Sequence, residues 1–63
     1  MTYSIGDKIS VWWNTFEKDE LGNNVAVILG IRDYNGPFDF CSKILKLTCP
    51  GTKRGWIEMT VTN

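Results

Sequence analysis

The chain has 63 residues, of which 43% are apolar, and its seven basic and seven acidic side chains give a formal net charge of zero. This length allows a single domain, residues 1–63, with a small core, and the apolar content argues against disorder. Zero net charge disfavours a dedicated duplex-DNA-binding protein, which must neutralise many phosphates. No apolar run approaches the ~20 residues that span a bilayer, so we expect a cytoplasmic protein.

The first predicted strand covers residues 8–13, "KISVWW". Neighbouring side chains of a strand point to opposite faces. Ile9, Val11 and Trp13 therefore share one side and are expected in the core. Trp12 lies on the other side with Lys8 and is expected at the surface.

Residues 14–24, "NTFEKDELGNN", connect this strand to the next. Asn14 and Glu17 fit a capping box and Gly22 could end a helix, which would allow one short helical turn at residues 15–21. Phe16 and Leu21 are five residues apart, which is poor spacing for the apolar face of a helix. An acidic, irregular loop is the alternative, and the sequence leaves both open.

The second predicted strand covers residues 25–34 and ends at Asn35-Gly36, a strong hairpin dipeptide. Strict alternation places Val25, Val27, Leu29 and Ile31 on the core side. It places Ala26, Ile28, Arg32 and Tyr34 on the outward side. Gly30, in the middle of the strand, indicates a bulge or a sharp bend.

Two further strands are predicted at residues 38–49 and 55–62, separated by a turn at Pro50-Gly51. The four runs together predict an all-β fold, a small barrel of four to five antiparallel strands. The predicted core consists of Ile9, Val11, Trp13, Val27, Leu29, Ile31, Leu45, Leu47, Ile57, Met59 and Val61.

The runs "GDKISV" and "RGWIEMTV" resemble the first and the closing strands of SH3-like small barrels. The chain also resembles short proteins encoded by bacterial viruses, which would imply a host cytoplasm. In SH3 domains a Trp pair lies on a middle strand, and a Pro-Ser-Asn-Tyr run near the end helps to bind proline-rich peptides. Here the Trp pair lies on the first strand and "IEMT" replaces that run, so proline-peptide binding is not expected.

The two cysteines, Cys41 and Cys49, flank a predicted strand that would separate their Cα atoms by roughly 27 Å. A disulfide needs about 4.4–6.8 Å, so we expect both thiols to be free. Without a histidine in the chain, the commonest general base is missing and no zinc site can be completed in a monomer. Lys43, two residues from Cys41, is a weak candidate for activating that thiol. We therefore expect no enzyme activity, no cofactor and no metal.

The acidic connection offers Asp19, Glu20, Asn23 and Asn24 as oxygen ligands for a hard cation, but without the spacing of a calcium loop. A solvated loop is the simpler interpretation.

Positive charge is concentrated toward the C-terminus, where residues 43–54 contain four cations and no acid, against six acids and three cations in residues 1–42. Outward aromatic side chains bordered by cations are typical of interface hot spots and of single-strand binders. The candidate binding residues are Trp12, Tyr34, Trp56, Arg32, Lys53 and Arg54. The sequence favours a non-enzymatic protein-binding module, such as an adaptor or inhibitor. Single-stranded nucleic-acid binding is the alternative, and the oligomeric state stays open.

Overall fold

A computed structural model describes residues 2–62, which form an all-β fold with five antiparallel strands in one unclosed sheet. The strands are β1 (Lys8–Ser10), β2 (Glu17–Lys18), β3 (Asn24–Asp33), β4 (Cys41–Thr48) and β5 (Trp56–Thr62). The sheet order is β1-β3-β4-β5, and β2 pairs with β3 off this path. The prediction of an all-β fold with four to five antiparallel strands is confirmed.

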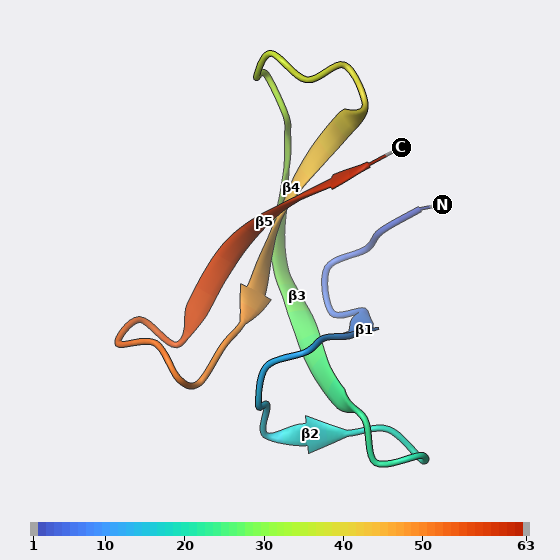
Figure 1. Cartoon of the computed structure of the whole chain (residues 1–63), viewed down its shortest axis with the longest axis vertical. Helices are drawn as coiled ribbons and strands as arrows, with labels where there is room; N and C mark the ends of the chain where they lie inside the picture. Colours follow the sequence, from blue (N-terminus) through green and yellow to red (C-terminus); the bar gives the residue numbers. More distant parts are fainter. Residues whose placement is uncertain (1, 63) are drawn as a thin grey trace.

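Strand β3 is the centre of the molecule, and the other elements are arranged around it (Figure 1). Its N-terminal part pairs with β1 and with β2, and its C-terminal part pairs with β4. The remaining strand, β5, continues the meander and pairs with β4 along its length. Both ends of β1 are extended by backbone bonds to β3: Ile28 N–H donates to Asp7 O at 2.9 Å, and Val11 N–H donates to Asn24 O at 3.0 Å.

The connection that could have held a helical turn is not helical in the structure. Residues 15–21 instead contain the short strand β2 and the start of a turn into β3. The side chain of Thr15 explains why the extended form is favoured, because its hydroxyl accepts a hydrogen bond from Val25 N–H at 3.1 Å. Within residues 2–62 no helix is long and apolar enough to cross a membrane.

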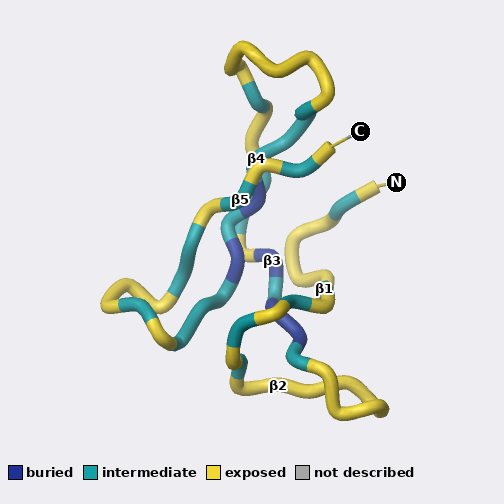
Figure 2. The backbone as a smooth tube through the Cα atoms, in the orientation of Figure 1, coloured by how far each residue is buried: buried dark blue, intermediate teal, exposed yellow. Residues whose placement is uncertain are grey.

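The buried core lies where β3 and β4 cross the middle of the molecule, shown in dark blue in Figure 2. Its fully buried side chains are Ala26, Ile28, Leu45 and Leu47. Partly buried side chains pack around this cluster: Tyr3, Ile9, Val11, Trp13, Ile31, Met59 and Val61. The predicted core positions on β4, Leu45 and Leu47, are confirmed. Five other predicted core residues contact the core as partly buried side chains: Ile9, Val11, Trp13, Met59 and Val61. Ile57 is half-buried.

In the N-terminal part of β3, Val25 is buried as expected, but the prediction is wrong at the positions that follow it. Leu29, expected in the core, is 45% exposed, and Val27 is only half-buried. Ala26 and Ile28, expected outside, are completely buried.

The cause is a register shift between Ile28 and Gly30 in the pairing with β4. The extra residue of a bulge reverses which parity faces the core. Ala26 and Ile28 therefore belong to the core cluster before the bulge, and Ile31 packs against that cluster after it. The bulge itself was predicted from Gly30, but its effect on the faces was not.

Strand β4 separates the two cysteines, as expected, and both are free thiols at its opposite ends. Lys43, the weak candidate for activating Cys41, follows a second register shift, between Cys41 and Lys43. Its ammonium group pairs with the carboxylate of Asp33 across the β3–β4 ladder.

Candidate functional site

Trp12 is a large, exposed side chain of the β1–β2 connection. Its side chain is 85% exposed, and its ring meets the ring of Trp13 edge-on, with centroids 5.4 Å apart and planes at 86°. Edge-to-face contact is a favoured arrangement of aromatic rings. The prediction that Trp12 faces outward while its neighbour packs on the core is therefore confirmed.

The ring of Trp13 fixes this arrangement to the sheet. Its indole N–H donates a hydrogen bond to the main-chain oxygen of Thr48, 3.1 Å away at the end of β4. The same Thr48 accepts a bond from Val27 N–H through its hydroxyl, at 2.9 Å. Trp12 thus contacts a ring that is hydrogen-bonded to Thr48 of β4, and Thr48 is in turn bonded to β3.

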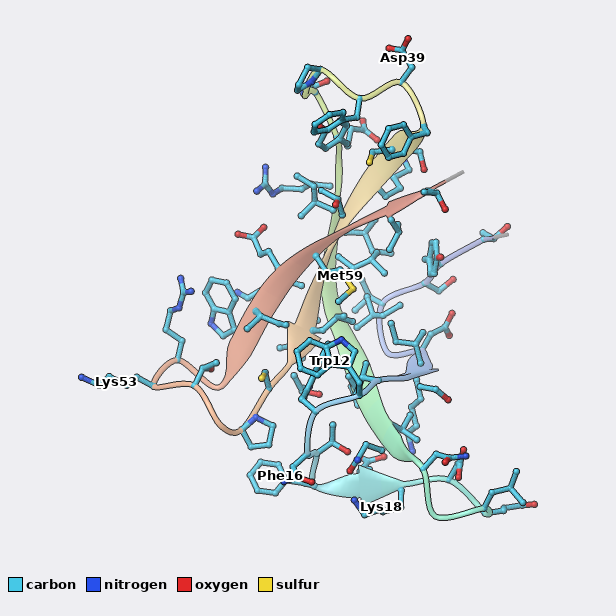
Figure 3. All side chains as sticks on the ribbon, in the orientation of Figure 1. Trp12, Phe16, Lys18, Asp39, Lys53 and Met59 are labelled. Atoms are coloured by element: carbon cyan, nitrogen blue, oxygen red, sulfur yellow. The ribbon has the colours of Figure 1, made fainter. Side chains whose placement is uncertain are left out.

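Phe16, four residues along the same connection, is 89% exposed. Figure 3 shows both Trp12 and Phe16 on the connection between β1 and β2. Phe16 was missed as a candidate binding residue, because it was considered only as part of a possible helix. A large aromatic residue in a polar, irregular segment was the signal that could have identified it.

Trp56 forms a second aromatic feature, which we call the Trp56 cluster: Trp56 with Lys46, Arg54, Arg32 and Glu58. The ammonium nitrogen of Lys46 lies 4.0 Å from the ring centroid of Trp56, and the guanidinium carbon of Arg54 lies 4.4 Å from it. The Nε of Arg32 binds the Glu58 carboxylate at 2.9 Å. Glu58 is in turn the register partner of Lys46.

The structure therefore brings together three of the six predicted binding residues, namely Arg32, Trp56 and Arg54. Sequence reasoning missed Lys46 and Glu58 in this group. The strand register around the Pro50-Gly51 turn could have found them, since it pairs residue 46 with residue 58 on the face that carries Trp56. Two cations lie over the Trp56 ring, and Glu58 is paired with Arg32, so the cluster is not a uniformly basic patch.

Lys53 and Tyr34 lie apart from that cluster. Lys53 projects from the tip of the β4–β5 turn (Figure 3). Tyr34 is half-buried at the other end of β4, where its N–H donates to Ser42 O at 3.1 Å. Six residues of strand, about 20 Å, separate Ser42 from Thr48, the register partner of Trp56. Tyr34 and Trp56 are therefore at opposite ends of the hairpin.

The acidic turn between β2 and β3 is organised by Asp19. Its Oδ1 accepts hydrogen bonds from Leu21 N–H at 2.9 Å and Asn23 N–H at 2.8 Å. The bond from the Asn23 backbone is the main cause that lowers the pKa of Asp19 below 3.8. Gly22 completes the turn at a φ of 84°, which favours glycine. The carboxylate thus holds the turn, and among residues 2–62 no three His, Cys, Asp or Glu side chains are grouped to hold a metal ion.

A second lowered pKa, that of Asp33, lies at the β3–β4 ladder. The Lys43 ammonium hydrogen-bonds to Asp33 and its charge adds to this effect, so the pKa of Asp33 lies below its usual value. The pair links β3 to β4 at the surface, so we interpret both groups as structural.

Comparison with protein-family models, with curated proteins and with solved structures finds no match to this chain.

Proposed function

We propose that this chain is a small, non-enzymatic protein-binding module, and that Trp12 is an anchor of its contact surface. The observation that carries the proposal is the 85% exposure of a tryptophan whose supporting ring is hydrogen-bonded to β4. Rigid aromatic side chains lose little conformational freedom on binding, and Trp is enriched at interface hot spots. Phe16, on the same connection, is also exposed and is a second candidate contact residue.

The Trp56 cluster supports a protein partner more than a nucleic acid. A base that stacks on Trp56 from the side of Lys46 or Arg54 must displace a cation that already lies over the ring. Arg32 is engaged by Glu58, so the positive charge there is partly neutralised. Single-strand binders need free rings beside free cations. Lys53, exposed at the tip of the turn, is available to either class of partner.

The resemblance to SH3-like small barrels is retained as part of the proposal. A short first strand, a long connection and a meander of three longer strands support it. A cytoplasmic location, in a host cell if the source is a virus, also stays a prediction.

The test is a comparison of the tagged parent, Trp12→Ala and Trp56→Ala in pull-downs from source cells, at low and at high salt. We expect one protein to be retained by the parent and by Trp56→Ala, and lost by Trp12→Ala. Loss of a hot-spot anchor weakens binding by more than ~1 kcal/mol. Equal retention by all three proteins would contradict the role of Trp12.

A second measurement addresses the nucleic-acid alternative. Fluorescence anisotropy with a mixed-sequence single-stranded oligonucleotide should show no binding at physiological salt. Binding that weakens steeply with salt and is reduced in Trp56→Ala would favour nucleic acid.

A further inference from the structure

We infer that the free edge of β5 is a self-association surface, through which two copies of this chain pair antiparallel about Met59. This edge is distinct from Trp12 and does not depend on the proposed function. In residues 2–62, β5 pairs only with β4, and no backbone hydrogen bond joins it to the segment before β1. That segment bonds to β3 and within itself, since Gly6 N–H donates to Ile28 O at 2.8 Å and Asp7 N–H donates to Ser4 O at 3.0 Å.

The hydrogen-bond pattern at the β4–β5 turn determines which groups face the open edge. Cys49 N–H donates to Gly55 O at 2.8 Å. Directly opposed residues of an antiparallel pair alternate between bonded and non-bonded positions. Thr48 and Trp56, the next opposed pair, are therefore non-bonded. Two contacts agree with this: Thr48 O accepts from the Trp13 indole, and Trp56 O accepts from the Thr52 hydroxyl at 3.4 Å.

Continuing this alternation along the register assigns the rest of the strand. Ile57, Met59 and Val61 direct their backbone groups to β4, opposite Leu47, Leu45 and Lys43. Glu58 and Thr60 occupy non-bonded positions, so their N–H and C=O groups point to the open edge. Such a row of unpaired donors and acceptors is a template for another strand.

The strand lacks the usual features that protect an edge. The sequence of β5, "WIEMTVT", contains no Lys and no Pro, and the register shift in its ladder lies beyond Val61, between Cys41 and Lys43 on β4. Its one charged side chain, Glu58, is bound to Arg32 of β3 and not directed to block the edge. The formal net charge of zero removes long-range repulsion between copies.

One register of the strand with itself is favoured. Pairing centred on Met59 places Ile57 opposite Val61 of the second copy and Glu58 opposite its Thr60, and it uses all of β5. Centring on Glu58 would oppose two carboxylates, which destabilises a strand pair. Centring on Thr60 would pair only residues 58–62. The second copy of this chain is thus an occupant whose side chains match the edge.

The pairing also explains the incomplete burial of β5. Ile57, Met59 and Val61 are only partly buried in one copy, although they face the same side as Leu45 and Leu47. In the register centred on Met59 these apolar side chains meet their counterparts across the new strand pair. Cross-strand apolar pairs of this kind stabilise a sheet.

The first test measures self-association of the full chain by sedimentation equilibrium and by NMR, from micromolar to millimolar protein. We expect a reversible dimer, with concentration-dependent amide shifts centred on residues 56–62 and increased exchange protection of the Glu58 and Thr60 amides. A monomer throughout this range, or shifts confined to the Trp12 region, would overturn the inference.

The backbone itself is tested with a chain carrying N-methyl-Thr60, assembled by ligation at Cys49. This change removes one outward N–H and leaves every side chain in place. It should abolish the dimer while the fold, judged by NMR shifts outside β5, is retained. A dimer of unchanged strength would overturn the inference.

The register is tested by the matched pair Thr60→Glu and Thr60→Lys, which differ only in the sign of a charge at an exposed position. In the proposed register residue 60 faces Glu58 of the second copy twice per dimer. Thr60→Glu should therefore weaken dimerisation relative to Thr60→Lys, by about tenfold. Equal dissociation constants for these two variants would overturn the register, and this comparison holds even if the N-methylated chain does not fold.

Discussion

The region from β3 to β5 and the region before β3 are held together by different means. The three C-terminal strands have ten, eight and seven residues, and their ladders enclose the buried leucines of β4. The strands β1 and β2 have only three and two residues. Before β3, side-chain hydrogen bonds hold much of the chain in place: the Trp13 indole donates to Thr48 O, and Thr15 and Asp19 accept bonds from backbone N–H groups. Burial thus stabilises the first region, and specific polar contacts shape the second.

Both regions expose large apolar side chains and ion pairs. The N-terminal region displays Trp12, Phe16 and Leu21, and the β3–β4 connection displays Phe38 and Phe40. Exposed ion pairs join Lys8 to Glu17 before β3 and Arg32 to Glu58 in the sheet of β3, β4 and β5. Exposed aromatic side chains therefore do not by themselves locate the binding surface. We assign it to the β1–β2 connection because the ring that supports Trp12 is hydrogen-bonded to Thr48 of β4.

The largest expected effect is at Leu45, which is completely buried and lies in register with Ile31 and Met59. Leu45→Ala should lower the free energy of unfolding by ~2–5 kcal/mol, because a fully buried leucine leaves a cavity. Urea unfolding followed by Trp fluorescence measures this change. Leu21→Ala, at an exposed leucine of the N-terminal region, is the control and should leave the midpoint nearly unchanged. Equal losses of unfolding free energy in Leu45→Ala and Leu21→Ala would mean that burial does not distinguish the two regions.

The bulge in β3 offers a sharper comparison between adjacent residues. Ile28→Ala should cost ~2–5 kcal/mol, whereas Leu29→Ala, at a side chain that is 45% exposed, should cost much less. The two substitutions remove the same number of carbon atoms one position apart, so only the facing of the strand differs. A larger loss at Leu29 in thermal melts would mean that the strand keeps uninterrupted alternation.

These comparisons show what the sequence could and could not predict. Alternation placed the core positions of β4 correctly because the ladder from Lys43 to Thr48 is regular against β5. It failed on β3 because one extra residue reverses the faces, and alternation cannot tell on which side of Gly30 the reversal begins. The bulge was visible as a glycine, but its consequence depends on the pairing with β4.

The candidate site was predictable only in part, for a related reason. Parity with Lys8 predicted the outward position of Trp12 correctly, although β1 ends at Ser10 and not at residue 13, and Trp12 lies in the bend that follows. Tyr34 and Trp56 were grouped as outward aromatics, yet the length of β4 puts them at opposite ends of a hairpin. Which side chains adjoin depends on strand register, and the sequence indicates that register only near the Pro50-Gly51 turn, where Lys46 pairs with Glu58.

A smaller effect is expected where the two regions meet, at the tryptophan pair. Trp13→Ala should cost less than the ~3–5 kcal/mol of a fully buried aromatic, since Trp13 is only half-buried. It should still cost more than Trp12→Ala, which removes an edge-to-face contact worth ~0.5–1.5 kcal/mol. Trp13→Phe keeps the ring but loses the bond to Thr48 O, and should fall between the two in thermal melts. Equal melting losses at both positions would mean that Trp12 is not a surface residue.

The smallest effect concerns the turn between β2 and β3, and it depends on pH. The folded state lowers the pKa of Asp19 through hydrogen bonds from the backbone of Asn23, so it favours the ionised carboxylate. A lowered pKa contributes stability above the unfolded pKa, and this contribution is lost as the pH falls through the folded value. Asp19→Asn should therefore unfold at slightly lower urea than the parent at pH 7, and the two should converge in acid, once the pH falls below the lowered pKa of Asp19.

The matched control is Glu20→Gln, which changes the net charge equally one residue away. If the turn is the cause, only Asp19→Asn should show the difference that disappears in acid, because Oδ1 of Asp19 accepts the bonds from Leu21 and Asn23. Identical pH profiles for the two variants would attribute the effect to net charge. The hydrogen bonds that Asp19 accepts would then not stabilise the N-terminal region, and this difference from the sheet of β3, β4 and β5 would be lost.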